Sequence, residues 1–302
     1  MTGETLMHDG QLVLEDRLAV ALISDAVAES AEMPVRRLPS PGTVNALFRI
    51  GDSLVARLPL MPTPLSEVRE EAERMAEFAE VSPVPAPSPV RVVDACAEYA
   101  SAWMVVSWVD GATAEGLSDA RHPLLAGDLA GLVVALRAAP LRGRSFDGHG
   151  RGGELSDHDE WVEECLARSG HLFDADAARR LWAELRTIPH PGVEVMSHRD
   201  LTPPNLLLSP EGRLSGALDT GSFGPVDPAL DLVAAWHLLG ADDRAVMRAG
   251  IGSDDAEWRR GAAWALQQAA GLGWYYEQSN PAMARLGLRT MGRLLAADEL
   301  RG

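Results

Sequence analysis

The chain has 302 residues, of which 46% are apolar and 24% charged, a composition typical of a folded globular protein. Its 27 basic and 44 acidic residues give a formal net charge of −17, which argues against a general nucleic-acid-binding surface and is compatible with cationic small ligands. Every basic residue is arginine, so the sequence excludes a Schiff-base lysine and a lysine that binds phosphate.

The N-terminal part is predicted to be rich in strands. Two apolar segments on either side of Gly51-Asp52 predict an antiparallel hairpin. A series of prolines between residues 83 and 89 favours either a packed extended connector or a short linker, because proline fits neither a helix interior nor a central strand. The predicted elements are, in chain order, a helix over residues 12–31, strands over 44–50 and 53–58 that follow residues 35–40 and a Pro41-Gly42 turn, a helix over 65–80, and strands over 90–95 and 102–109.

The pattern becomes mainly helical after Asp110-Gly111, beginning with a predicted helix over residues 124–139. Short apolar runs between turn residues predict a small strand–loop–strand unit over residues 193–218. Residues 141–154 hold five glycines among Arg, Asp and His, and are predicted to form a mobile surface loop. We therefore predict two parts, a strand-rich one over residues 1–108 and a mainly helical one over residues 109–302.

The beginning of the chain shows no basic segment followed by an apolar stretch, which is the pattern of a signal peptide. No apolar run reaches the roughly 18–20 residues that cross a bilayer. We therefore expect a cytoplasmic monomer or homodimer whose partners include neither a membrane nor a nucleic acid.

The segment His198-Arg199-Asp200-Leu201, followed after three intervening residues by Asn205, matches the H-R-D-L-x-x-x-N signature of a kinase catalytic loop. Such a loop carries a carboxylate toward an incoming hydroxyl and an amide toward Mg²⁺. A second carboxylate on the metal is expected to follow on a short strand, and Asp219 lies fourteen residues after Asn205. The sequence has neither a GxxxxGK[ST] nor a GxGxxG motif, which excludes the simple P-loop and Rossmann fingerprints.

Together with this loop, residues 42–52 (GTVNALFRIGD), residues 55–59 (VARLP) and residues 224–232 (GPVDPALDL) make the chain similar to the aminoglycoside phosphotransferase family. These are small-molecule kinases with a protein-kinase-like fold. The resemblance covers about residues 35–285. It implies an α+β fold of two lobes, a small antiparallel sheet with one helix and a mainly helical lobe, with the nucleotide in the crevice.

The resemblance also assigns roles to single residues. Asp200 matches the catalytic base, and Asn205 and Asp219 match the Mg²⁺ ligands. His198 and Asp231 match residues that brace the catalytic loop. Arg199 stands where the family commonly has glycine, and it is expected either to face solvent or to meet a phosphate or an acidic segment.

For the phosphoryl donor, ATP or GTP, the resemblance places Arg57 where such kinases have the lysine that holds the α- and β-phosphates. Glu71 is the expected partner of Arg57 on the following helix. The other expected nucleotide-binding positions are the backbone N–H groups of Gly42, Thr43 and Val44 over the phosphates, and the hinge residues Ser107 and Val109.

Candidate acceptor-binding residues are Asp157, Glu160, Trp236 and Glu277. Three of these candidates have a simpler interpretation: the acidic cluster at residues 157–160 is typical of a solvated helix start, and Trp236 is typical of a core position. The resemblance implies ATP- or GTP-dependent phosphorylation of a hydroxyl on a small molecule. The expected acceptor is foremost an aminoglycoside-type antibiotic, because the best-known substrates of the family are polycationic aminoglycosides, which a net charge of −17 suits. The alternatives are a macrolide, another antibiotic or an endogenous metabolite alcohol as acceptor, or a nucleotide-binding pseudokinase without transfer activity.

Overall fold

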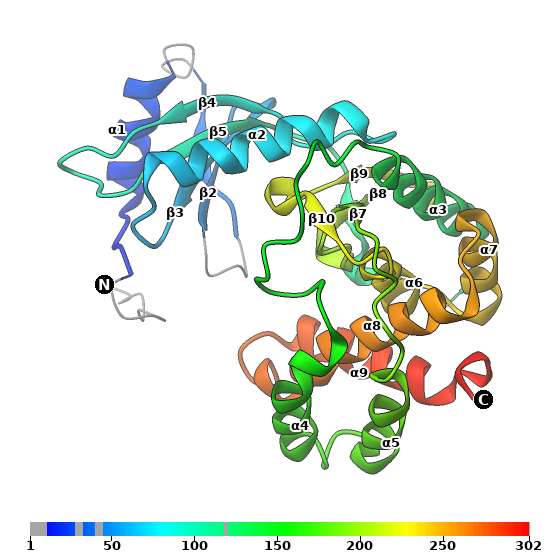
Figure 1. Ribbon diagram of the computed structural model, residues 1–302. Coiled ribbons are helices and arrows are strands. Elements are labelled where there is room, and N and C mark those ends of the chain that lie inside the picture. Colours follow the sequence, from blue (N-terminus) through cyan, green and yellow to red (C-terminus); the bar gives the residue numbers. More distant parts are fainter. Residues whose placement is uncertain (1–10, 28–32, 40–44, 118–119, 302) are drawn as a thin grey trace. The chain divides into compact units, whose positions relative to one another are not determined.

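The computed structural model describes residues 11–27, 33–39, 45–117 and 120–301 (Figure 1). The chain forms two compact units, the first made of the residues up to Glu80 together with Ala86–Val109, and the second of Val81–Pro85 together with the residues from Asp110 onward. The sequence did not indicate that Val81–Pro85 pack with the second unit. They do so because the backbone N–H of Ala217 donates a hydrogen bond to the carbonyl of Pro85, at 3.0 Å.

The first unit is built on a five-stranded sheet in which all neighbouring strands are antiparallel. The predicted hairpin is present: Ile50 pairs with Leu54, and Gly51 has the positive φ of 53° that a tight turn requires. In spatial order, the strands are β1 (Val35–Arg37), β2 (Asn45–Ile50), β3 (Leu54–Pro59), β5 (Trp103–Ser107) and β4 (Pro89–Val93).

Two helices pack on this sheet, α1 (Asp16–Ala26) and α2 (Leu65–Val81), each with its own apolar cluster. Side chains alternate along a strand, so Ala56 and Leu58 of β3 join the cluster of α1 while Val55 joins the cluster of α2. Arg57 lies two residues after Val55 on the same strand. The alternation therefore places the Arg57 side chain on the face of the sheet that α2 covers.

Seven α-helices are the main secondary structure of the described part of the second unit. Helices α8 and α9 pack closely because Gly287 has no side chain, and a Cβ atom at this position would collide with Leu272. No helix among the described residues is both long and apolar enough to cross a membrane. The helices are α3 (Pro123–Arg137), α4 (Asp159–Arg168), α5 (Ala175–Leu185), α6 (Val233–Leu238), α7 (Ala241–Ile251), α8 (Asp255–Tyr275) and α9 (Pro281–Ala296).

Short strands position the catalytic loop within this unit. The strands are β6 (Ala112–Thr113), β7 (Val195–Ser197), β8 (Leu206–Leu208), β9 (Leu214–Ala217) and β10 (Gly224–Val226). Strand β8 lies between β6 and β9, whereas β7 pairs with β10. The predicted strand–loop–strand unit is therefore divided between two small sheets, and residues 198–205 connect one sheet to the other.

Candidate active site

The backbone of the catalytic loop is held from behind by Asp231, in the short 3-10 helix η6 (Leu230–Leu232). Its carboxylate accepts hydrogen bonds from the backbone N–H groups of His198, at 3.0 Å, and Arg199, at 3.2 Å. Burial raises the pKa of the Asp231 carboxyl, and the nearby His198 opposes that rise. A buried carboxylate thus fixes the start of the loop by compensating two backbone donors.

His198 links the loop to the end of β9. Its Nε2 donates to the carbonyl of Leu218 at 2.8 Å, and its Nδ1 accepts from the backbone N–H of Asp200 at 3.3 Å. The ring is fully buried. Both ring nitrogens are therefore engaged within the protein, which leaves neither of them available for proton transfer.

Asp200 and Asn205 are in direct contact. The Nδ2 group of Asn205 donates to Oδ2 of Asp200 at 2.9 Å and to its backbone carbonyl at 3.0 Å. This orientation of the amide leaves its Oδ1 atom as the end that can bind a cation. The loop therefore presents a carboxylate and an amide oxygen side by side.

Asp219 is brought next to this pair by the backbone. The N–H of Leu218 donates to the carbonyl of Asn205 at 2.7 Å, and Asp219 follows in a left-handed conformation with φ of 55° and an exposed side chain. A carboxylate and an amide oxygen are hard donors of the kind Mg²⁺ prefers. Among the described residues no group of three or more His, Cys, Asp or Glu could hold a metal, so an ion here would take further oxygens from substrate or water.

The loop over residues 141–154, predicted to be a mobile surface loop, is tied to the catalytic loop. The guanidinium of Arg199 donates to the carbonyl of His149 at 3.0 Å and lies 3.5 Å from the carboxylate of Asp147. Arg151 of the same loop places Nη2 3.3 Å from Oδ1 of Asp200. Sequence reasoning missed Arg151, because no motif marks it and glycine-rich composition favours a solvated loop.

In the first unit, Arg57 forms an ion pair with Glu71 of α2, with 2.9 Å between Nη2 and Oε1. Ser107, at the end of β5, exchanges hydrogen bonds with Ser88: the Ser107 N–H donates to the Ser88 carbonyl, and the Ser88 N–H donates to the Ser107 hydroxyl, both at 2.9 Å. Val109 is the last residue of this unit. The expected phosphate-covering residues Gly42, Thr43 and Val44 lie outside the described residues.

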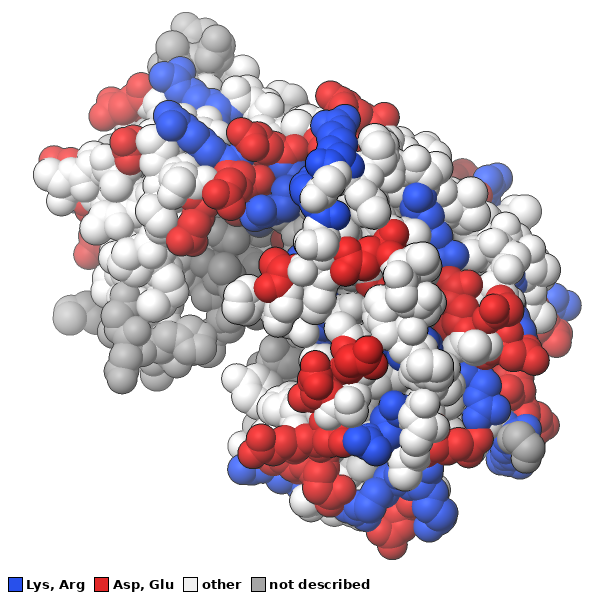
Figure 2. Space-filling view, in the orientation of Figure 1, with Lys and Arg blue, Asp and Glu red and all other residues white. Residues whose placement is uncertain are grey.

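Of the candidate acceptor residues, Asp157 and Glu160 are exposed, in η3 (Leu155–His158) and at the start of α4. Within the described residues neither forms an ion pair. Glu277, just beyond α8, lies 3.5 Å from the imidazole of His171. In the view of Figure 2, acidic and basic side chains are interleaved over the lower part of the molecule around α4 and α5, where partners such as Arg179 and Glu163 form ion pairs.

Trp236 is wrong as an acceptor contact. The side chain is fully buried, with its ring 5.7 Å from that of Trp258 and 4.5 Å from the guanidinium carbon of Arg244. Trp236 was a candidate because it follows the GPVDPALDL segment, but tryptophan is also a large apolar residue that is often buried. Here α6 packs against α8, and this packing places the ring in the core.

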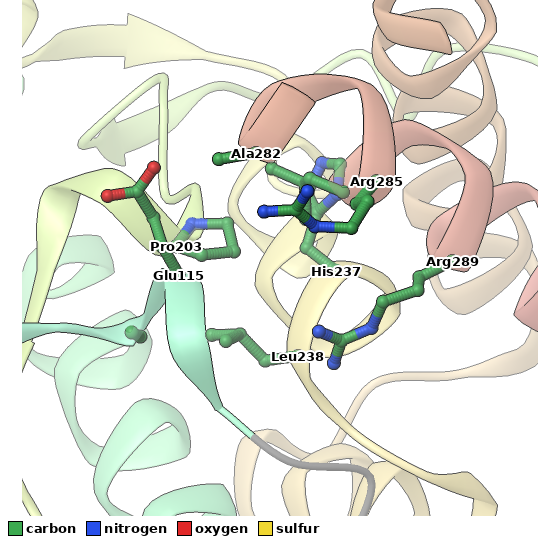
Figure 3. Close-up of a pocket in the computed structure, with 9 residues that line it drawn as sticks. Glu115, Pro203, His237, Leu238, Ala282, Arg285 and Arg289 are labelled. Atoms are coloured by element: carbon green, nitrogen blue, oxygen red, sulfur yellow. The ribbon is translucent and has the colours of Figure 1, made fainter. Parts of the chain in front are cut away.

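A small pocket of about 60 Å³ lies next to the catalytic loop and reaches it through Pro203 (Figure 3). Glu115 lies across the pocket from Arg285 and Arg289, which extend from neighbouring turns of α9. Arg289 also donates to the carbonyl of Leu117 at 3.0 Å. None of these side chains was predicted from the sequence, since they belong to three segments far apart in the chain.

The family model described as the phosphotransferase enzyme family matches residues 35–264. A search of curated proteins found no match. Among solved structures, the GDP complex of aminoglycoside 2'-phosphotransferase-IIIa has 17% identity and a TM-score of 0.68, over 93% of this chain and 99% of that one.

Two further solved structures have the same fold. Macrolide 2'-phosphotransferase MphH from Brachybacterium faecium has 19% identity and a TM-score of 0.60, over 90% of this chain and 97% of that one. The streptomycin–ATP complex of APH(2")-IIa has 15% identity and a TM-score of 0.58, over 95% and 98%. At these identities the structures establish the kinase-like fold, which agrees with the expected sheet-containing and mainly helical parts.

Proposed function

This chain belongs to the phosphotransferase enzyme family, and from that premise we propose that it transfers the γ-phosphoryl group of ATP or GTP to a hydroxyl of a small molecule. The observation that carries the proposal is the constellation of Asp200, Asn205 and Asp219. The catalytic loop and the end of β9 bring the three together through hydrogen bonds. This is the set of groups that phosphoryl transfer requires.

In the proposed reaction, the acceptor hydroxyl donates its hydrogen bond to the carboxylate of Asp200. Its oxygen forms a new bond to the γ-phosphorus, while the bond from that phosphorus to the bridging oxygen of the nucleotide breaks. The proton passes to Asp200, and the nucleoside diphosphate leaves. Asp200 contributes mainly by orienting the hydroxyl, because loose phosphoryl-transfer transition states need positioning more than covalent help.

Asn205 and Asp219 would hold Mg²⁺. The donor set fits, since the amide of Asn205 turns its nitrogen toward Asp200 and keeps its oxygen for a cation. The bound ion would neutralise charge on the nucleotide phosphates. The chain's own part is to keep these two oxygens in place, through the hydrogen bond from Leu218 to Asn205.

In the first unit, Arg57 would hold the α- and β-phosphates. Its planar fork can bind phosphate through two N–H groups, and the ion pair with Glu71 restricts its side chain. In this chain, which has no lysine, arginine is the residue type that is permanently cationic at neutral pH. The hinge residues Ser107 and Val109 are proposed to contact the base.

For the acceptor, we favour an aminoglycoside. The exposed carboxylates of Asp157 and Glu160 form no ion pair with other described residues, and the chain carries a net charge of −17. Both features would attract a polycation. Glu277 is a third proposed contact, because its pairing with His171 is long and exposed. The macrolide enzyme MphH shares this fold, which makes a macrolide the second candidate.

The proposal is tested by offering the purified protein kanamycin, gentamicin, streptomycin and a macrolide with Mg·ATP or Mg·GTP. Mass spectrometry then detects acceptors that have gained one phosphate. We expect phosphorylation of an aminoglycoside, with a KM that rises with ionic strength because salt screens charge attraction. A macrolide product would replace the acceptor assignment. Absence of transfer to every acceptor, combined with absence of Mg·nucleotide binding, would contradict the proposed function.

A further inference from the structure

Arg151 contacts the carboxylate on which the proposed reaction depends. Its Nη2 lies 3.3 Å from Oδ1 of Asp200, and both side chains are about one-third exposed, at 33% and 32%. An ion pair this exposed contributes little to folding stability. Its location on the proposed catalytic base therefore suggests a role in the reaction.

The segment before Arg151 is fixed by the catalytic loop itself. Arg199 of that loop donates to the carbonyl of His149 at 3.0 Å, approaches the carboxylate of Asp147 at 3.5 Å, and lies over the ring of Phe146, 5.3 Å from its centre. The side chain of Arg199 is only 19% exposed. The residue that precedes Asp200 thus holds the loop that supplies Arg151.

The segment after Arg151 is fixed by Val226 of β10, by the buried Asp227 that follows this strand, and by Arg260. The backbone N–H of Asp227 donates to the carbonyl of Gly152, and Arg260 donates to the carbonyl of Gly153, both at 3.3 Å. Gly152 has a φ of 131°, and a Cβ there would lie 2.8 Å from Cγ1 of Val226. Glycine is required at this position, and the backbone of Arg151 is held on both sides.

The two oxygens of Asp200 have different partners. Arg151 donates to Oδ1 and Asn205 donates to Oδ2, at 3.3 and 2.9 Å. Two donors on opposite oxygens fix the rotation of the carboxyl group about its Cβ–Cγ bond. A carboxylate has about four lone-pair sites, so one oxygen can still accept the hydroxyl of an acceptor.

We propose that Arg151 is a positioning residue that holds the carboxylate of Asp200 in the orientation that receives the acceptor hydroxyl. This inference rests on the proposed function. It predicts that Arg151 affects kcat rather than nucleotide binding, because the contact is to the base. A guanidinium has several N–H donors in one plane, which makes it better suited than an ammonium group to fixing a carboxylate.

The test compares the variants Arg151→Gln, Arg151→Lys and Arg151→Ala with the wild type. The charge-matched control is Arg180→Gln, because Arg180 is an exposed residue of α5 that forms no ion pair among the described residues. Turnover is measured with the panel aminoglycoside that the wild type phosphorylates fastest, and as phosphate release from Mg·ATP with water as acceptor. We expect kcat to fall about 100-fold in Arg151→Gln, the scale of a small misplacement, with nucleotide KM within about twofold. Arg151→Lys should retain part of the activity.

A chemical rescue separates positioning from a structural role. Guanidinium at non-denaturing concentration should restore part of the kcat of Arg151→Ala, while urea at the same concentration should not. Equal kcat values in Arg151→Gln and in the wild type would overturn the inference. A higher kcat in Arg151→Gln would also overturn it, because the ion pair would then inhibit Asp200. A wild type without turnover would instead overturn the proposed function, and the role of Arg151 with it.

Discussion

At the scale of single residues, the site is organised by hydrogen bonds between its own polar groups. Asp231 fixes the backbone at His198, His198 fixes Leu218, and Asn205 fixes Asp200. Each contact satisfies a backbone or side-chain donor that would otherwise be costly to bury. The residues of the H-R-D-L-x-x-x-N signature could be predicted because their types and spacing are demanded by chemistry, whereas Arg151 belongs to no such pattern.

The Arg57–Glu71 pair makes a residue-scale prediction for nucleotide binding. Glu71→Gln should raise the nucleotide KM about tenfold, a loss of ~1.4 kcal/mol, because the guanidinium loses the carboxylate that restricts it. Glu73→Gln removes the same charge from an exposed position of α2 and should leave the KM nearly unchanged. Steady-state kinetics with varied ATP measure both, and equal KM values in the two variants would contradict the assigned role.

His237 makes a second prediction, for stability against pH. It is buried between Thr290 and Gln268, at 2.9 Å from each, and burial lowers the pKa of His237 from 6.5 to about 4. Between these pH values the unfolded chain binds a proton that the folded chain excludes, so the free energy of unfolding falls as pH falls. The loss approaches about 3 kcal/mol.

Urea unfolding at pH 7 and pH 4.5 measures this loss in the wild type and in His237→Gln, which cannot titrate at this position. The variant should be less stable at pH 7 and should lose less stability on acidification. Parallel losses in the two proteins would contradict the assignment of this pH dependence to His237.

At the scale of elements, the sequence predicted the hairpin of β2 and β3 and the helix α2 to within about one residue, because apolar runs and the Gly51-Asp52 turn are local signals. The helix predicted over residues 12–31 is shorter in the structure, where α1 begins at Asp16 and ends at Ala26. The sequence predicted a loop over residues 141–154 but not its contacts with distant segments. The hydrogen bond from Arg199 to His149 and the one from Arg260 to Gly153 join segments about fifty and one hundred residues apart, and local composition carries no trace of them. It also failed to show that β7 pairs with β10.

The contact between α8 and α9 gives an element-scale prediction with a control on the same helix. In Gly287→Ala the new Cβ would lie 2.6 Å from Cβ of Leu272 and 3.0 Å from the carbonyl of Ala269, so the helices must separate, at a cost of about 1–3 kcal/mol. Gly292→Ala meets nothing within 4 Å and should stabilise the protein by up to ~1 kcal/mol, because alanine favours a helix.

Thermal unfolding of both variants checks these two signs. A stabilised Gly287→Ala protein would show that the two helices do not approach as closely as the structure describes.

At the scale of the whole molecule, two units carry different parts of the proposed chemistry. The first unit holds the Arg57–Glu71 pair, and the second holds the catalytic loop, the proposed metal ligands and the candidate acceptor residues. The net charge of −17 argued against nucleic acid from the start. Its distribution could not be inferred from composition: ion pairs such as Arg179–Glu163 and Arg186–Asp159 neutralise part of the acidity of α4, while Asp157 and Glu160 remain exposed.

The most direct test of the account is transfer of a radiolabelled γ-phosphate from Mg·ATP or Mg·GTP to the panel of acceptors, by the wild type and by Asp200→Asn. Asp176→Asn, an exposed aspartate of α5, is the matched control. The account predicts transfer by the wild type and by Asp176→Asn, and a rate lower by about 10²–10⁴-fold in a folded Asp200→Asn protein. Transfer by Asp200→Asn at a rate near that of the wild type would contradict the central claim.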